Sequence, residues 1–165
     1  MKIGVISDTH LKIPDERLTR IIEEHFSAAD LILHAGDLVE LAVLDIFSGK
    51  DYFAVCGNMD SLEVKSRFPR KLVLEIEGCK IGLIHGWGNP SNLEYQVLKE
   101  FNEEIDCCVF GHTHRAENHM LNNILMFNPG SATDNRFSEV NSIGILETGK
   151  KITGTIIPFE KKRGR

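Results

Sequence analysis

The sequence contains no long hydrophobic run. Although 42% of its 165 residues are hydrophobic, no stretch approaches the roughly 18 consecutive apolar residues that a membrane-spanning helix needs. The N-terminus also lacks the charged, apolar and small-residue regions of a secretory signal peptide. We therefore expect a soluble, cytoplasmic protein that has no membrane partner.

Cysteine pairs with CxxC spacing are missing as well. The four cysteines, Cys56, Cys79, Cys107 and Cys108, include no CxxC pair. The last two lie in a strand-like run, IDCCVF, which suits buried thiols. Their spacing disfavours both a disulfide framework and a thiolate zinc site.

Positive charge is too scarce for a groove that binds duplex nucleic acid. The formal net charge is −5 and the pI is about 5.8, whereas affinity for a phosphate backbone depends mainly on clustered lysine and arginine. The basic cluster KKRGR at about residues 160–165 is interpreted as a solvated tail. GWGNPS at Gly86 to Ser91 partly matches a dinucleotide-binding fingerprint, but the first apolar run ends in DTH instead, and no GxxxxGK(S/T) phosphate loop occurs.

The hydrophobic residues occur in short runs. Five runs each end in a polar or glycine-containing turn: KIGVISD, DLILHAGD, YFAVCGN, KIGLIHG and DCCVFGH. Such runs are typical of buried parallel strands. Helical patterns alternate with them at Glu16 to Phe26, Leu41 to Phe47 and Asn92 to Phe101, which indicates an α/β fold.

Strand follows strand in two parts of the sequence. Glu77-Gly78 predicts a hairpin turn within LVLEIEGCKIGLIHG, and Asn122-Asn123 and Thr148-Gly149 predict turns in the C-terminal third. The length suits one domain, and no linker or repeat divides it. We predict a single domain over residues 1–165 with two packed mixed β-sheets flanked by helices, a four-layer α-β-β-α sandwich.

Polar side chains collect where the apolar runs end. They are Asp8, His10, Asp37, Asn58, His85, His112 and His114. Taken alone, each is more often a turn former, a helix cap or a structural histidine. Because parallel strands deliver their following loops to one edge of a sheet, five strand ends can direct these side chains into one crevice. Their shared position favours a site.

The residue types in this set predict metal binding. Asp8 and His10, like His112 and His114, have i, i+2 spacing, which in extended backbone puts both side chains on one face. Imidazole and carboxylate ligands suit manganese, iron, nickel, cobalt or zinc, and the lack of cysteine disfavours a closed structural zinc site. Seven candidates exceed the needs of one four-coordinate ion and fit two ions, with Asp37 as the predicted bridge.

The ordered motifs resemble the five sequence blocks of the calcineurin-like metallophosphoesterases. The blocks are DTH (Asp8 to His10), GD (Gly36-Asp37), GN (Gly57-Asn58), HG (His85-Gly86) and GHTH (Gly111 to His114). The small size and NPGS at Asn128 to Ser131 are similar to the compact bacterial and archaeal phosphodiesterase branch. The resemblance implies two ligand sets: Asp8, His10, Asp37 and His114 for one ion, and Asp37, Asn58, His85 and His112 for the other.

The resemblance also implies an activity. We expect a dinuclear phosphodiesterase with two divalent ions per chain, Mn²⁺ or Ni²⁺ first, with Zn²⁺, Co²⁺, Fe²⁺ or Mg²⁺ as alternatives. A metal-bridging hydroxide would attack phosphorus in line, and the cations would attract a small phosphodiester despite the acidic chain. The alternative is a catalytically weak scaffold, because the fold also serves in a retromer coat subunit. The physiological substrate, the native metal and the oligomeric state, monomer or homo-oligomer, stay open.

Met59 departs from the family pattern, because many relatives have a histidine there that can protonate the leaving group. Asp60 is the nearest titratable candidate, and a turn or cap aspartate is the alternative. Asp37 and Asn58 are the other predicted catalytic residues. Two positions are possible for Trp87: it lies either at the mouth of the substrate site or in the core. Candidate substrate contacts are Arg115, Arg136 and Ser131.

Overall fold

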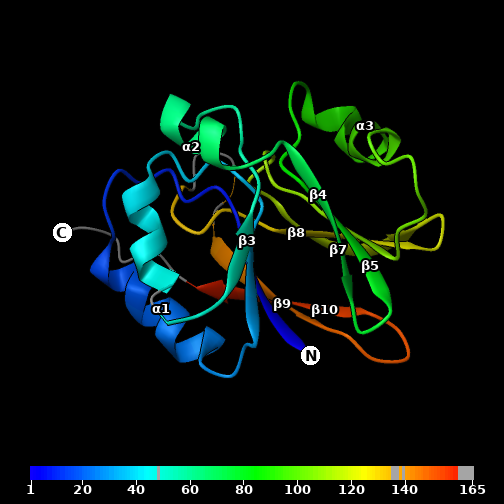
Figure 1. Ribbon diagram of the computed structural model, residues 1–165, viewed down its shortest axis with the longest axis horizontal. Coiled ribbons are helices and arrows are strands. Elements are labelled where there is room, and N and C mark those ends of the chain that lie inside the picture. Colours follow the sequence, from blue (N-terminus) through cyan, green and yellow to red (C-terminus); the bar gives the residue numbers. More distant parts are fainter. Residues whose placement is uncertain (48, 135–137, 139, 160–165) are drawn as a thin grey trace.

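The strands of the protein form two sheets of five strands each. The computed structural model describes residues 1–47, 49–134, 138 and 140–159 (Figure 1). In spatial order, the first sheet consists of β10 (Thr153–Phe159), β9 (Asn141–Glu147), β1 (Lys2–Ile6), β2 (Leu31–His34) and β3 (Tyr52–Ala54). The second consists of β4 (Lys71–Ile76), β5 (Cys79–Ile84), β6 (Cys107–Val109), β8 (Ile124–Pro129) and β7 (Ala116–Leu121).

The five apolar runs that predict parallel strands are strands of the protein, and they are divided between the two sheets. β1, β2 and β3 pair in parallel in the first sheet. β5 and β6 pair in parallel in the second, and β8 continues that direction. The remaining pairs are antiparallel, so both sheets are mixed, as predicted. Each sheet therefore brings the loops after its parallel strands to one edge.

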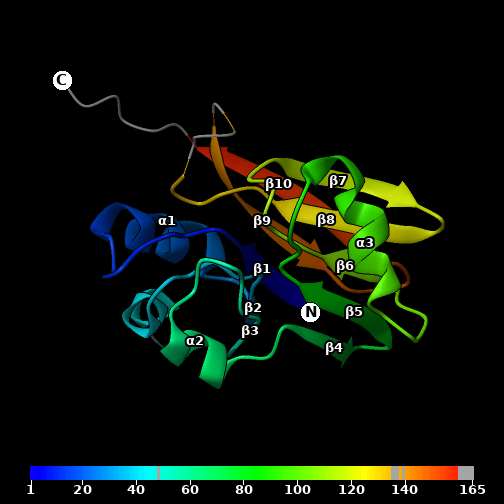
Figure 2. The same ribbon diagram turned by 90° about the horizontal axis from the view of Figure 1, so that it is seen from above.

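Helices cover the outer faces of the paired sheets. α1 (Glu16–Phe26) and the 3₁₀ helix η1 (Leu41–Phe47) cover the first sheet, and α3 (Leu93–Lys99) covers the second. The remaining helices are α2 (Leu62–Arg67) and the short 3₁₀ turn η2 (Pro90–Asn92). Figure 2 shows α1 and α3 on opposite sides of the two sheets. Asp15 caps α1 by accepting a hydrogen bond from the Leu18 N–H at 2.9 Å, and the buried stripe of α1 packs against the first sheet.

Three buried hydrophobic clusters fill the spaces between the four layers. Ile3 and Val5 point between the sheets, where they meet residues of the second sheet such as Leu83 and Phe127. Ile6 faces the opposite way, toward α1. A third cluster lies between α3 and the second sheet. Because both faces of the central strands are buried, their sequences read as continuous apolar runs, and the predicted α-β-β-α sandwich is confirmed.

The local predictions were correct in most places, and one helix was missed. Glu77-Gly78 and Asn122-Asn123 form the predicted hairpin turns, with φ of 49°, 78°, 50° and 66° in chain order. Leu41–Phe47 is helical, as predicted, with 3₁₀ geometry, whereas α2 was not predicted. Within the described part of the chain, no helix combines the length and apolar character required to cross a bilayer. The basic tail, residues 160–165, lies outside the described residues.

Candidate metal centre

The loops that follow the parallel strands of both sheets meet at one edge. Backbone hydrogen bonds join them directly. The Asp8 N–H donates to the Gly36 carbonyl and the His10 N–H to the Asp37 carbonyl, both at 3.0 Å, and the Gly111 N–H donates to the His85 carbonyl at 3.1 Å. Each of these bonds joins loops of one sheet, and the His112 N–H, which donates to Asp8 Oδ2 at 3.1 Å, joins the two sheets. The predicted residues are therefore brought together from loops of both sheets.

The backbone at this edge has an uncommon conformation. Five of the seven candidate ligands have left-handed φ values: Asp8 at 52°, His10 at 46°, Asp37 at 55°, His112 at 69° and His114 at 58°. The i, i+2 argument, which assumed extended backbone, was therefore wrong in its geometry. Such strained residues persist where the surrounding structure fixes them, and they cluster at functional sites.

Two glycines allow the loops to approach closely. A Cβ atom on Gly57 would lie 2.1 Å from Asp37 Oδ1. A Cβ atom on Gly111 would lie 2.1 Å from Ser7 Oγ and 2.7 Å from Asp8 Oδ2. Neither glycine is needed for a positive φ; each is needed because a carboxylate occupies the space of a side chain.

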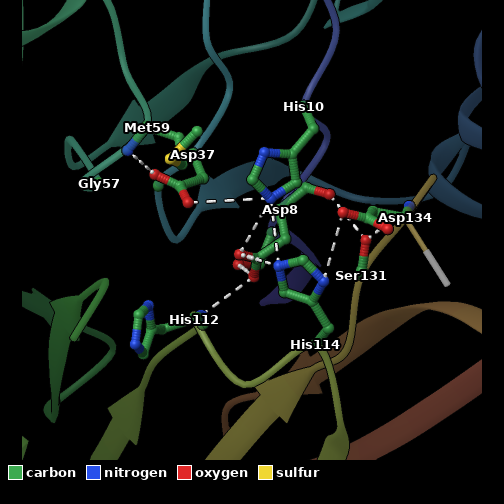
Figure 3. Close-up of polar contacts among 12 residues, drawn as sticks. Asp8, His10, Asp37, Gly57, Met59, His112, His114, Ser131 and Asp134 are labelled. Carbon is green, nitrogen blue, oxygen red and sulfur yellow. Dashed lines mark hydrogen bonds and ion pairs between the residues drawn. The ribbon is translucent and has the colours of Figure 1, made fainter. Parts of the chain in front are cut away.

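Asp8 lies at the centre of the arrangement (Figure 3). Its Oδ1 is 3.1 Å from His114 Nε2, 3.7 Å from His10 Nε2 and 3.9 Å from His85 Nε2. Asp37 Oδ2 is 3.2 Å from His85 Nε2 and 3.8 Å from His10 Nε2. Both carboxylates therefore face histidines of both predicted ligand sets.

Two groups can each surround an ion, because their ligand atoms all lie within 4.8 Å of one another. One contains Asp8, His10 and His114, and the other contains Asp8, Asp37 and His85. Asp8 belongs to both groups, whereas the sequence predicts Asp37 as the shared ligand.

Asn58 and His112 lie beside these groups. His112 Nδ1 is 3.1 Å from Asn58 Oδ1, and His112 Nε2 is 2.9 Å from the Gly88 carbonyl oxygen. The His112 ring meets the His85 ring edge-on at 5.4 Å, but Figure 3 shows it directed away from Asp8. The structure therefore places Asn58 and His112 next to the second group without including them in it.

The electrostatics of the cluster favour positive charge. Burial opposes ionisation of Asp8, but contacts with His10 and His114 hold the pKa of its carboxyl far below its usual value. Burial lowers the pKa of His85, while Asp37 and Asp8 raise it more, to about 9. The pKa of Asp37 is lowered against burial mainly by His85, and that of His10 is raised mainly by Asp8. A cation can take the place of the imidazole protons.

Unsatisfied buried atoms support this fit. Among the described residues, Asp8 Oδ1 and His85 Nε2 are buried and form no hydrogen bond of good geometry, although His114 Nε2 lies 3.1 Å from the first and Asp37 Oδ2 3.2 Å from the second. Buried polar atoms of this kind are uncommon and call for an explanation such as a bound ion. Oxygen and imidazole nitrogen are ligands that divalent transition metals accept, so the residues present fit a metal centre.

Residues 1–151 match the family model of the calcineurin-like phosphoesterase superfamily domain. The chain belongs to this superfamily. A probable metallophosphoesterase of Methanocaldococcus jannaschii is 40% identical over 98% of this chain and 83% of the relative. A phosphodiesterase of the same organism is 29% identical over 92% of this chain and 95% of the relative.

Solved structures give the same assignment. A novel archaeal phosphodiesterase superposes with a TM-score of 0.76 and 28% identity, covering 96% of this chain and all of its own. Vps29 of Entamoeba histolytica, solved with Zn²⁺, superposes with a TM-score of 0.68 and 24% identity, covering 96% and 99%. The second likeness shows the fold alone. The chain thus combines the fold of a calcineurin-like phosphoesterase with candidate metal ligands.

Asp60 contacts the loops that carry candidate metal ligands. Its carboxylate is buried and accepts the backbone N–H groups of Asp37 at 3.2 Å, Val39 at 2.6 Å and Gly57 at 2.7 Å. The helix cap that the sequence offered as its alternative role belongs to Ser61, which accepts from the Val64 N–H. These contacts favour a positioning role over that of a general acid.

The other predicted substrate contacts differ in their surroundings, because some support a loop of the site and others lie at the surface. Ser131 is buried, donates to the Asp8 carbonyl at 2.7 Å and accepts the Asp134 N–H at 2.8 Å, which favours support of the Asp8 loop over contact with a substrate. Arg115 is exposed just after His114. The Met59 N–H donates to Asp37 Oδ1 at 2.7 Å, while its side chain is 57% exposed. Arg136 lies outside the described residues.

Two supporting residues were not among the predicted site residues. Asp134 Oδ2 lies 3.7 Å from His114 Nδ1, the arrangement in which a carboxylate orients a ligating histidine. His34 Nδ1 accepts the Gly36 N–H at 3.1 Å, and burial lowers the pKa of His34 to about 4, which keeps it neutral. Asp134 comes from a separate loop, so no sequence spacing links it to His114.

Proposed function

We propose that the chain is a metal-dependent phosphodiesterase in which two divalent ions bind around Asp8 and Asp37. The observation that carries this proposal is the convergence of buried carboxylate and imidazole atoms, Asp8 Oδ1 and His85 Nε2 among them, in two adjoining candidate ligand groups. Mn²⁺ or Ni²⁺ is the proposed metal. When bound, such cations acidify water and neutralise charge on phosphoryl oxygens.

The protein residues have separate tasks in this proposal. Asp8, His10 and His114 hold one ion, and Asp8, Asp37 and His85 hold the other. The lowered pKa values of Asp8 and Asp37 keep both carboxylates ionised for binding, whereas the raised pKa values of His10 and His85 make protons compete with the metal for these histidines. Asn58 and His112 stand at the rim beside His85, where a substrate phosphate arrives.

The phosphodiesterase relative supports a diester substrate, and the Vps29 likeness supports a second candidate. A catalytically weak scaffold of the same fold would retain the architecture without the reaction. The two functions differ in whether hydrolysis depends on the metal.

Metal removal and restoration test this distinction. After treatment with a chelator, the protein should not hydrolyse bis(p-nitrophenyl) phosphate, and addition of Mn²⁺ or Ni²⁺ should restore the activity. Co²⁺, Zn²⁺ and Mg²⁺ serve as comparisons, and p-nitrophenyl phosphate reports monoester hydrolysis. Restored diester activity that exceeds monoester activity is the expected result. Inactivity with every metal on both esters would overturn the proposal.

The residue at position 59 should govern the range of leaving groups. Because the methionine side chain cannot donate a proton, kcat/KM should be high for aryl diesters and fall steeply as the leaving-group pKa rises. A series of substituted phenyl and alkyl diesters measures the slope. Met59→His should flatten it and Met59→Leu should not. A slope near zero in the natural protein would contradict this assignment.

A further inference from the structure

A pocket opens directly beside the metal centre. Its volume is about 720 Å³, and Asn58 and His85 form its border with the candidate ligands. Small-molecule sites typically measure about 300 to 1,000 Å³, so this pocket can hold a substituent of nucleotide size. A substrate phosphate at the metal centre would have one ester group within reach of it.

The wall of this pocket is basic, although the chain as a whole is acidic. Lys65, Arg70 and Lys71 line it, against one carboxylate, that of Glu100. Lys65 Nζ donates to the Asn58 carbonyl at 2.9 Å, and Lys71 Nζ donates to the Glu100 carbonyl. Each ammonium group has three donors, so both lysines keep donors for an anion.

Arg70 and Trp87 add a flat surface. The Arg70 guanidinium lies over the indole ring, with its central carbon 5.5 Å from the ring centroid. Among the described residues, Arg70 forms no ion pair, and its side chain is exposed. A guanidinium stacked in this way keeps its N–H edge for a phosphate or carboxylate, and planar rings stack on aromatic side chains and on arginine.

We propose that this pocket binds one ester substituent of the phosphodiester and selects a substituent with a planar ring and a second anionic group, as in a nucleotide. The proposal rests on the proposed function, because the pocket border includes His85, a candidate metal ligand, and Asn58, which lies beside it. Arg70, Lys65 and Lys71 bind the second anion, and Trp87 lies beside the ring.

A matched pair of substrates tests the selection. The 5′-p-nitrophenyl esters of thymidine 5′-monophosphate and of thymidine 3′,5′-bisphosphate share the scissile bond, the leaving group and the ring, and differ only in the second phosphate. With metal-loaded protein, we expect kcat/KM for the bisphosphate ester to be higher by about tenfold. Equal values would overturn the inference while leaving the proposed function intact, whereas no hydrolysis of either ester would remove the proposed function.

Variants locate the selection in the pocket. Arg70→Gln should reduce the ratio between the two substrates toward one, and Arg70→Lys should retain part of it. Arg20→Gln is the matched control, because Arg20 is exposed on α1 and pairs with Glu16, away from the pocket. An unchanged ratio in Arg70→Gln would contradict the assignment of this pocket.

Fluorescence gives a readout that does not depend on activity. Trp87 is the only tryptophan of the chain, so tryptophan fluorescence, excited at a wavelength that the two tyrosines do not absorb, reports on the surroundings of Trp87 in this pocket. In chelator-treated protein, AMP should change the emission with saturation, and adenosine and inorganic phosphate should each bind several-fold more weakly. Arg70→Gln should weaken AMP binding, and Arg20→Gln should not. Adenosine binding as tightly as AMP, or no saturable change, would refute the proposal.

Discussion

Asp37→Asn is expected to lower kcat/KM for a diester by about a thousandfold or more, a change of about 4 kcal/mol in transition-state stabilisation. Asp37 Oδ2 faces His85 at 3.2 Å and His10 at 3.8 Å. The substitution removes a negative charge that one ligand group requires and that borders the other. The affinity for the metal should therefore fall, and the negative charge that offsets the bound cations should decrease by one.

Asparagine is the sharpest replacement at this position because it preserves the shape of the side chain. Its amide oxygen can still accept the Met59 N–H that Asp37 Oδ1 accepts at 2.7 Å, so the loop should keep its conformation. Steady-state kinetics and bound-metal analysis measure the outcome. Asp45→Asn, an exposed change on η1, is the control. Normal metal content together with a normal rate in Asp37→Asn would exclude it as a ligand.

Asp60→Asn is expected to reduce the free energy of unfolding by about 2 to 3 kcal/mol. The carboxylate accepts three backbone N–H groups, two at Oδ2 and one at Oδ1. An amide has one oxygen, so its NH₂ group must face at least one of these donors, which leaves a buried group unsatisfied. Urea unfolding measures the loss, again with Asp45→Asn as the control.

The effect on activity should be smaller than that of Asp37→Asn. If Asp60 holds the loops that carry Asp37 and Asn58, kcat/KM should fall by about 10- to 100-fold, as for residues that orient metal ligands. The dependence of the rate on leaving-group pKa should stay unchanged. A steeper dependence in Asp60→Asn would instead identify Asp60 as the general acid, and a larger loss than in Asp37→Asn would contradict the positioning role.

The helices and turns that were predicted correctly depend on interactions within a few residues of the chain. The pattern of Glu16 to Phe26 predicts α1 with its observed bounds, because the cap at Asp15 and the apolar stripe both act within a few residues. The Glu77-Gly78 turn was predictable for the same reason. The 3₁₀ geometry of Leu41–Phe47 was not, since its short apolar pattern fits both kinds of helix.

The sequence by itself determined the succession of strands and helices apart from α2, the family, and the set of residues that gather at one edge, because apolar periodicity and ordered motifs are properties of the chain. Only the tertiary structure decided that Asp8 belongs to both ligand groups, that Asp60 supports the loops of Asp37 and Gly57, and that three cations line a pocket beside His85. These features depend on how two sheets pack and on left-handed backbone at Asp8 and Asp37. Contacts between loops that are distant in sequence have no fixed spacing, so only the packed molecule specifies them.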